Sequence, residues 1–304
     1  MSVIIPPYLQ KGDSIGLVCP AGFMPLEKVQ TAINTLEHWG FKIIVGNTVG
    51  GESKNYFSGS DEQRLNDLQT MMDDDSIKAI MCARGGYGMG RIIDEINFKK
   101  FKRNPKWIIG FSDITVLQSH LLSNYKIASL HAPMAAAFND DPDKNEFVQS
   151  LYKALVGEKA AYSCPGHSFN KNGKANGRLV GGNLSLLAHL VGTASDINTK
   201  NKILFIEDVG EYIYNVDRML YQLKRSKHFK NLAGLIVGGF TDMKDTNSPF
   251  GQTTEDVINE IVSEYDFPVC FNFPVSHEKE NYALKIGCRY SLKITENKVL
   301  LKED

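Results

Sequence analysis

The sequence predicts an α/β protein in which a doubly wound N-terminal domain precedes a smaller, β-rich α/β domain. Three observations predict this fold. Short β-branched runs alternate with amphipathic helical patterns in the first half, and turn-forming residues accumulate over 139–178. The second half ends in two β runs joined by Glu296-Asn297, a plausible hairpin turn. We therefore expect one domain over residues 1–150 and another over 170–304.

The first half predicts five βα units. Its strands are expected at 15–19, 41–45, 77–83, 107–110 and 127–130. Amphipathic helices are expected between them at 25–39, 61–73, 91–101 and 114–125. Ser60 and Gln63 form a capping-box pattern ahead of the second helix, and Gly40 stands where a glycine ends the first. This series fits a flavodoxin-like sheet, in which ligands bind at the carboxyl ends of the strands.

The second half mixes helices with more strands. One short helix is expected at 145–156, within the turn-rich stretch, and further helices at 183–191, 212–226 and 254–265. Strands are expected at 202–207, 232–240, 269–273, 290–295 and 298–301.

Composition excludes several classes of protein. The 304 residues carry 34 Lys and Arg against 35 Asp and Glu, a formal charge of −1, which gives no reason to expect a nucleic-acid partner. The five cysteines are scattered without a C-x-x-C pair, and no spaced ligand set predicts a metal or other cofactor. No apolar run approaches the roughly 18 to 20 residues that span a bilayer, and no basic n-region opens the chain. We expect a cytoplasmic protein without a membrane partner.

A serine stands where a buried strand turns into a helix. The run Trp107-Ile-Ile-Gly-Phe-Ser112-Asp113 predicts the geometry of a nucleophile elbow, which lifts a hydroxyl above the sheet. The amide of Asp113 would face the same space at a helix N-terminus, where a developing oxyanion is favoured. Ile114 replaces the second glycine of G-x-S-x-G, so the α/β-hydrolase pattern is not met. Ser112 is therefore either a nucleophile or the N-cap of the helix.

Residues 84–90, which we call the glycine loop, follow the third predicted strand. Glycines permit positive φ angles and close approach of the backbone, so successive amides can form an anion-binding nest. Neither G-x-G-x-x-G nor G-x-x-x-x-G-K-[ST] occurs, so the nucleotide-binding motifs fail. The loop is either a tight βα turn or an anion site. If it lies beside the Ser112 turn, amides from Gly85 or Gly86 and from Asp113 would form a two-donor oxyanion hole.

A nucleophilic serine needs a base, and the base needs an orienting acid. His277 enters an irregular polar loop directly after a strand, where functional side chains gather. Glu207 ends a strongly apolar strand, where an ionised carboxylate needs a partner such as an imidazole N–H. Asp208 and Glu211, in contrast, fit the N-terminal charge of the following helix. Surface or interhelical roles are expected for His38, His120, His189 and His228, and His167 falls in the polar linker. His131 follows a strand directly, so it either has a structural role or lines the pocket.

Taken together, these segments resemble the LD-carboxypeptidase family of serine peptidases, the muramoyltetrapeptide carboxypeptidases, which also includes microcin C immunity hydrolases. The resemblance extends over nearly the whole chain in the expected order. It rests on Cys19-Pro-Ala-Gly22, Ala83-Arg-Gly-Gly-Tyr-Gly88, Gly110-Phe-Ser-Asp-Ile-Thr115, His131-Ala-Pro-Met134, Gly181-Gly-Asn-Leu-Ser185, Phe205-Ile-Glu-Asp208, and Phe273-Pro274 with His277 and Asn281.

The resemblance implies a Ser-Glu-His triad of Ser112 as nucleophile, His277 as general base and acid, and Glu207 as the residue that orients the imidazole. It also implies an active site formed between the two domains, a homodimer, and a murein-derived peptide as substrate. The reaction would release D-alanine from the cytoplasmic murein tetrapeptide during cell-wall recycling. Arg84 is a candidate for a cation facing the terminal carboxylate of that substrate.

Two departures from the family pattern concern the histidine loop. Ser276 stands where the family commonly has glycine before the histidine, and Leu284-Lys-Ile-Gly287 lacks the usual proline. Two alternatives also remain. One is an immunity-type hydrolase that uses the same triad on a peptidyl-nucleotide antibiotic. The other is a non-catalytic protein that binds a nucleotide or phosphate in the glycine loop.

Overall fold

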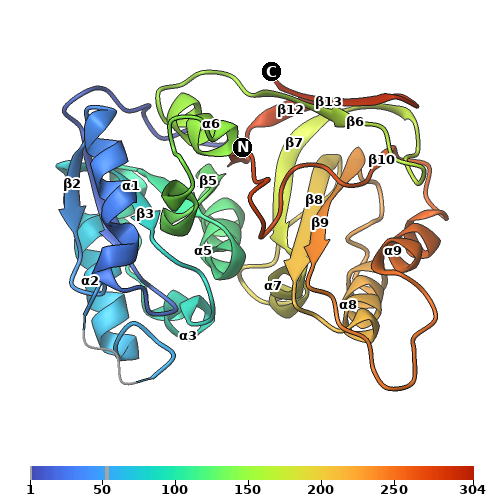
Figure 1. Ribbon diagram of the computed structural model, residues 1–304, viewed down its shortest axis with the longest axis horizontal. Helices are drawn as coiled ribbons and strands as arrows, with labels where there is room; N and C mark the ends of the chain where they lie inside the picture. The colour runs from blue at the N-terminus through green and yellow to red at the C-terminus, as the bar shows by residue number, and fades with distance from the viewer. Residues whose placement is uncertain (1, 52–54) are drawn as a thin grey trace. The chain divides into compact units, whose positions relative to one another are not determined.

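The chain folds into two compact units. The computed structural model describes residues 2–51 and 55–304. The first unit contains the chain up to Glu158 together with Tyr282–Lys285, and the second contains Lys159–Asn281 and Ile286–Asp304. The chain therefore leaves the first unit once and returns to it for four residues before it ends in the second. Figure 1 traces this path by colour.

The first unit is built on a sheet with the order β11-β5-β4-β3-β1-β2. Neighbouring strands from β2 to β5 pair in parallel, so their carboxyl ends share one edge of the sheet. The flavodoxin-like order predicted for the first five strands is confirmed. The strands are β1 (Ser14–Val18), β2 (Lys42–Val45), β3 (Ile77–Cys82), β4 (Trp107–Gly110), β5 (Ser129–His131) and β11 (Leu284–Ile286).

Local signals at the helix ends explain why the helices of this unit begin and end where they do. The capping box of α2 is present, since Ser60 accepts from the amide of Gln63 and the Gln63 side chain accepts from the amide of Ser60. Gly40, with φ of 96°, follows the end of α1 in the left-handed region that glycine favours. The helices are α1 (Leu26–His38), α2 (Asp61–Asp73), α3 (Met89–Ile92), α4 (Lys99–Arg103), α5 (Thr115–His120) and α6 (Glu146–Leu155).

The single helix expected over 91–101 is wrong, because the chain is extended at Ile96 between two short helical segments. The Gln69 side chain from α2 both donates to the carbonyl of Asn97 and accepts from its amide, at 3.0 and 2.8 Å. The Asn97 side chain then accepts from the amide of Lys99 at the start of α4. A side chain from a distant helix therefore satisfies the backbone where the helix is broken.

The second unit contains a mixed sheet with the order β10-β9-β8-β7-β12-β13-β6. The strands from β7 to β10 are parallel, whereas β12 runs antiparallel to both β7 and β13, and β13 to β6. The predicted terminal hairpin is confirmed as β12 and β13. The elements are β6 (Ala161–Pro165), β7 (Gly173–Asn183), β8 (Lys202–Val209), β9 (Gly234–Thr241), β10 (Val269–Cys270), β12 (Arg289–Ile294), β13 (Lys298–Glu303), α7 (Leu184–Leu190), α8 (Ile213–Arg225) and α9 (Thr254–Val262).

Two strands of this sheet, β6 and the first half of β7, occupy part of the turn-rich stretch at 139–178 and were not expected there. Exposed and buried residues alternate along the first half of β7, and its run of polar and small residues, Gly-Lys-Ala-Asn-Gly, carries the composition of a loop. Pairing with β12 along Gly173–Arg178 makes this segment a strand despite its composition.

All five cysteines are buried. Within residues 2–51 and 55–304, none of the helices is both long and apolar enough to cross a bilayer.

We expect Gly181→Ala to lower the free energy of unfolding by more than about 2 kcal/mol. Gly181 has φ of 137°, and a Cβ atom there would overlap with the carbonyl oxygen of Phe205 on the paired strand β8. Gly192→Ala is the matched control, because Gly192 also has positive φ but faces open space, so its cost should stay near 1 kcal/mol, roughly that of the left-handed backbone alone. Urea unfolding followed by circular dichroism measures both, and equal midpoints would contradict this account of the β7–β8 contact.

Candidate active site

Ser112 lies at a strained turn at the carboxyl end of β4. Gly110 has φ of 154°, Phe111 is extended, and Ser112 itself has φ of 63° before the helical segment begins. A left-handed backbone costs a residue with a side chain roughly 1–2 kcal/mol, and such strain gathers at functional sites. The N-cap of the helical segment at Ser112–Ile114 is Phe111 and that of α5 is Ile114, so Ser112 is the N-cap of neither. The half-buried hydroxyl thus stands at a strand-to-helix corner, as the sequence predicts.

The glycine loop lies directly against this turn. A Cβ atom on Gly85 would come within 2.8 Å of Cβ and 3.1 Å of Oγ of Ser112, so no side chain fits at position 85. Gly86 has φ of 101°, and a Cβ atom there would meet the Tyr56 hydroxyl at 2.8 Å. The structure therefore brings Gly85 and Ser112 together, at the shared edge of the adjacent parallel strands β3 and β4.

Arg84 is exposed and lies along the segment that follows β1. Its Nη1 donates to the carbonyl oxygen of Phe23 at 2.6 Å, while the amide of Gly22 donates to the carbonyl of Gly85 at 3.0 Å. Backbone and side chain together thus connect the glycine loop to the segment after β1. The guanidinium that the sequence marks as a candidate anion ligand is already held by one carbonyl.

Asp113 is buried, with 1% of its surface exposed, and its carboxylate is directed at the glycine loop. Its Oδ2 accepts from the amide of Met89 at 2.7 Å. Burial raises the pKa of Asp113 to about 6, against the lowering effect of the amides of Met89 and Gly88 and of the Arg64 charge. The residue after Ser112 therefore anchors the first turn of α3.

In the second unit, Glu207 and His277 form a close pair. Nδ1 of His277 lies 2.6 Å from Oε2 of Glu207, so the imidazole N–H donates to the carboxylate. The Glu207 side chain is completely buried, and in the described part of the chain its Oε1 has no hydrogen-bond partner. A buried carboxylate is stable only with such a partner. The acid and the histidine singled out from the sequence are thus brought together across 70 residues of chain.

The pKa of His277 is raised above its ordinary value of 6.5 by the balance of opposing effects. Burial has the largest single effect and lowers the pKa. The hydrogen bond to Glu207 and the negative charges of Glu207 and Asp208 together raise the pKa by more than burial lowers it. The pair therefore stabilises the folded chain fully below the unfolded pKa of about 6.5, and this contribution is lost as the pH rises through the higher folded pKa.

Glycines of β9 make room for the loop that carries His277. A Cβ atom on Gly238 would come within 3.2 Å of Cβ of Glu207 and would overlap with the carbonyl of Val275. A Cβ atom on Gly239 would lie 2.5 Å from Cβ of Ser276. Neither glycine was predicted as a site residue, although a Gly-Gly pair inside an apolar strand is a signal of close backbone approach.

Ser276, which departs from the family pattern, shapes the same loop. Its Oγ accepts from the amide of Glu278 at 3.0 Å and donates to the carbonyl of Glu280, also at 3.0 Å. These bonds close a compact turn around the histidine. The serine thus supplies a restraint that a glycine would lack.

The expectation that Asp208 complements the following helix is wrong. Asp208 is buried, with 2% exposed, and accepts from the side chain of Asn183 at 2.7 Å and from the amides of Ser185 and Val209, both at 2.9 Å. Burial raises its pKa to about 6. Asp208 therefore holds the start of α7 beside Glu207. Glu211 does lie ahead of α8, where it accepts from Asn215.

The candidate residues are divided between the two units. The Ser112 turn and the glycine loop belong to the first unit, while Glu207 and His277 belong to the second. His277 is followed after four residues by Tyr282–Lys285, which return to the first unit, so the histidine loop is covalently tied to both. In residues 2–51 and 55–304 no group of three or more His, Cys, Asp or Glu side chains could hold a metal ion.

Four of the other histidines contact aromatic or acidic side chains. His131 is completely buried beside Phe111, and His120 stacks on Phe98. His228 pairs with Asp196 at 2.7 Å, and His167 stacks on Phe271.

Comparison with known proteins identifies the class to which this fold and site belong. The family model of the LD-carboxypeptidase N-terminal domain matches residues 15–132, and that of the C-terminal domain matches 176–292. The chain belongs to the LD-carboxypeptidase family and is a carboxypeptidase.

The chain is 33% identical to the probable murein peptide carboxypeptidase of Bacillus subtilis (strain 168) over 300 residues, which cover 98% of this chain and 94% of that protein. The crystal structure of muramoyltetrapeptide carboxypeptidase from Oxalobacter formigenes superposes with a TM-score of 0.84 at 27% identity, covering 95% of this chain and 98% of that one. Microcin C7 self immunity protein MccF in complex with aspartyl sulfamoyl adenosine has a TM-score of 0.86, with 99% of each chain covered. Its identity of 22% shows a shared fold alone.

We expect Glu207→Gln to lower the pKa of His277, because the variant removes the charge and the carboxylate acceptor while burial remains. Nuclear magnetic resonance of the ring carbons against pH measures the shift. Glu211→Gln is the control, since Glu211 is not among the charges that act on His277 and should leave the titration unchanged. An imidazole that titrates identically in both variants would contradict the pairing.

Proposed function

We propose that the chain is a serine-type LD-carboxypeptidase that cleaves the amide between an L-configured centre and a terminal D-amino acid. The proposed substrate is the murein tetrapeptide, which would lose D-alanine during cell-wall recycling. The Glu207–His277 pair, separated by 2.6 Å, carries the proposal, because it is the acid–base half of a serine triad. The names of the relatives from Bacillus subtilis and Oxalobacter formigenes support the same substrate class.

In this mechanism Oγ of Ser112 attacks the carbonyl carbon while Nε2 of His277 takes its proton. The resulting imidazolium is stabilised by Glu207 and then gives the proton to the departing amine, which leaves as D-alanine. Water, deprotonated by the same imidazole, hydrolyses the acyl-enzyme and restores the serine. General-base assistance of this kind contributes on the order of 10²- to 10⁴-fold.

The oxyanion of each tetrahedral intermediate would be held by the amides of Asp113 and Gly86. Gly85 gives space to Ser112, and the left-handed turn at Ser112 leaves the amide of Asp113 at the beginning of a helical segment. Loss of one such donor costs about 10²- to 10³-fold in kcat. Arg84, exposed beside this loop, is our candidate for the cation that faces the terminal carboxylate of the substrate.

We further propose that the protein acts in the cytoplasm as a homodimer, without a cofactor or a nucleic-acid partner. The near-neutral charge supports the absence of a nucleic-acid partner.

A second candidate function, which the family resemblance implies, is hydrolysis of a peptidyl-nucleotide antibiotic. The neighbour in fold is a microcin C7 self immunity protein in complex with aspartyl sulfamoyl adenosine. It would use the same three residues. Turnover of the tetrapeptide L-Ala-γ-D-Glu-meso-diaminopimelate-D-Ala and of an aminoacyl sulfamoyl adenosine, measured side by side, separates the two functions.

We expect Ser112→Ala to fold normally and to lose at least about 10⁴-fold in D-alanine release, because no other hydroxyl would replace the nucleophile. Chromatographic detection of D-alanine from the tetrapeptide measures the rate. Ser123→Ala, which changes a serine in the helical segment Leu121–Tyr125 that follows α5, is the control and should retain activity. Full activity of the Ser112 variant would eliminate the proposed nucleophile.

We expect Gly85→Ala to lower kcat by about 10²-fold, the loss that a misplacement of 1 Å can cause. The new Cβ would lie 2.8 Å from Cβ of Ser112 and would displace it. Gly12→Ala controls for a changed glycine in the same unit, since Gly12 faces open space and should keep its kcat. Unchanged kcat in the Gly85 variant, measured with the same assay, would contradict the close packing of the loop on the serine.

A further inference from the structure

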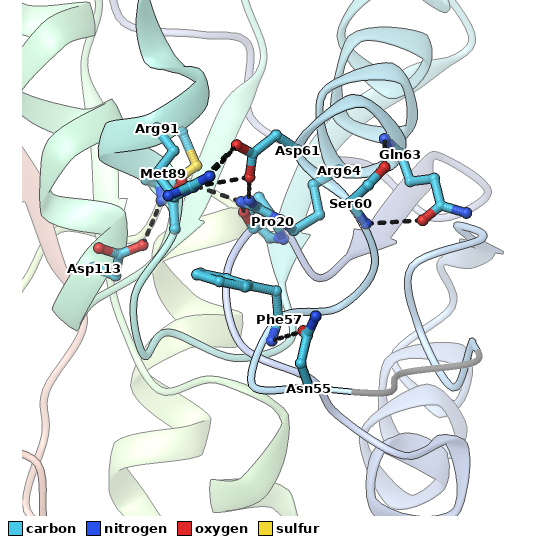
Figure 2. A network of polar contacts seen from close by, with 11 residues as sticks. Pro20, Asn55, Phe57, Ser60, Asp61, Gln63, Arg64, Met89, Arg91 and Asp113 are labelled. Atoms are coloured by element: carbon cyan, nitrogen blue, oxygen red, sulfur yellow. Dashed lines mark hydrogen bonds and ion pairs between the residues drawn. The ribbon is translucent and has the colours of Figure 1, made fainter.

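A completely buried arginine joins the segments around the glycine loop. Arg64, on α2, has no exposed surface, and its Nη1 donates to the carbonyl of Pro20 at 2.7 Å and to that of Gly88 at 3.1 Å. Its Nη2 pairs with Asp61. Figure 2 shows this network, with Met89 and Asp113 beside it. One guanidinium therefore binds the segment after β1, the glycine loop and the first turn of α2.

Burying this guanidinium in the core is energetically unfavourable, because the charge loses its hydration. Burial lowers the pKa of Arg64 despite the opposing charge of Asp61, and within the described residues Nε has no hydrogen-bond partner. Asp61 is shared with the exposed Arg91, and both arginines lie over the ring of Phe57, at 4.9 and 5.4 Å. Because the Asp61 side chain is 41% exposed, this ion pair offsets only part of the cost of burying the guanidinium, and stability alone does not explain the arginine.

Groups outside the glycine loop hold several of its backbone atoms. Besides the bond from Arg64 to the carbonyl of Gly88, the amide of Gly22 donates to the carbonyl of Gly85 and the carboxylate of Asp113 accepts from the amide of Met89. Arg64 and Asp113 therefore restrain the same end of the loop. Arg64 donates to the carbonyl of Gly88, and Asp113 accepts from the amide of Met89. Their opposite charges also attract each other.

The loop needs such restraint because its own residues provide little. Gly86 and Gly88 have φ of 101° and 152°, and glycine has the widest choice of backbone conformations. A donor that stabilises a transition state is effective only if its direction is fixed before the reaction. The residues that fix it therefore influence the rate although they do not touch the substrate.

We propose that Arg64 is a positioning residue that, together with the carboxylate of Asp113, fixes the glycine loop so that the amide of Gly86 is directed at the oxyanion beside Ser112. The inference rests on the proposed function, because it assigns Arg64 an effect on that same reaction. The anchoring of the loop backbone by Arg64 does not depend on the identity of the substrate.

Arg64→Met, Arg64→Lys and the matched control Arg91→Met test the proposal. Arg91→Met removes the same kind of side chain from the same aspartate and ring, but not from the carbonyls of Pro20 and Gly88. We expect Arg64→Met to lower kcat by about 10²- to 10³-fold, as for loss of an oxyanion donor, with KM within threefold. Arg64→Lys should recover part of the loss, and Arg91→Met should stay within threefold of the parent.

A peptidyl boronic acid that adds to the serine provides a second measurement, because its tetrahedral adduct resembles the transition state. Its inhibition constant should rise in parallel with the loss of kcat in Arg64→Met. A loss confined to KM or to the unfolding midpoint, with kcat and the inhibition constant unchanged, would show a merely structural role and overturn the proposal.

Hydrogen exchange of the amide of Met89 separates failure of this proposal from failure of the proposed function. We expect faster exchange in Arg64→Met than in Arg91→Met, and unchanged exchange would overturn the anchoring whatever happens to activity. Full activity of Ser112→Ala would overturn the proposed function while leaving a rise in exchange intact.

If Arg64→Met does not fold, Asp113→Ala and Asp113→Asn take its place. The asparagine, which keeps an acceptor for Met89, should retain the higher kcat, and equal, parent-like values for both would overturn the proposal.

Discussion

The shared carboxyl edge of a parallel sheet is the constraint on which the first unit depends. Because β1, β3 and β4 run in the same direction, the segments that follow them meet at one edge, although they are separated by tens of residues in the chain. Contacts among these segments, such as the amide of Gly22 on the carbonyl of Gly85, follow from that geometry. A serine after β4 therefore meets a run of glycines after β3 without any local sequence signal that relates the two.

The residues singled out in the two units share features that oppose stability. Ser112 adopts a left-handed backbone, Glu207 and Asp113 are buried carboxylates, and Arg64 is a buried cation. The three buried side chains are tolerated because a specific partner offsets part of the cost of each: the imidazole of His277 for Glu207, the amide of Met89 for Asp113, and Asp61 with two carbonyls for Arg64. Such concentrations of strain and buried charge are typical of sites under functional constraint.

Features set by local interactions could be predicted from the sequence, whereas those set by distant partners could not. The capping box at Ser60 and the strand-to-helix turn at Ser112 involve residues a few positions apart, and both are present. The helix expected over 91–101 is interrupted by Gln69, 28 residues away from Asn97. Asp208 resembles a helix-start residue until its bond to Asn183 is known, and Arg64 on an amphipathic helix resembles a solvent-facing cation. The pairing of Glu207 with His277 came from the family resemblance, since neither residue carries a local signal of the other.

The return of Tyr282–Lys285 to the first unit makes the two units inseparable by a single break in the chain. These residues include most of β11, an edge strand of the first sheet, and they are bound to α6 and to the end of the unit by the amide of Ala283 on Ser150 and by Lys285 on the carbonyl of Glu158. A truncated chain that stops near 158 would expose the edge of β5 and leave acceptors without their donors. Evolution by recombination of whole domains, common where units are contiguous in sequence, would therefore have to exchange the two halves of this enzyme together.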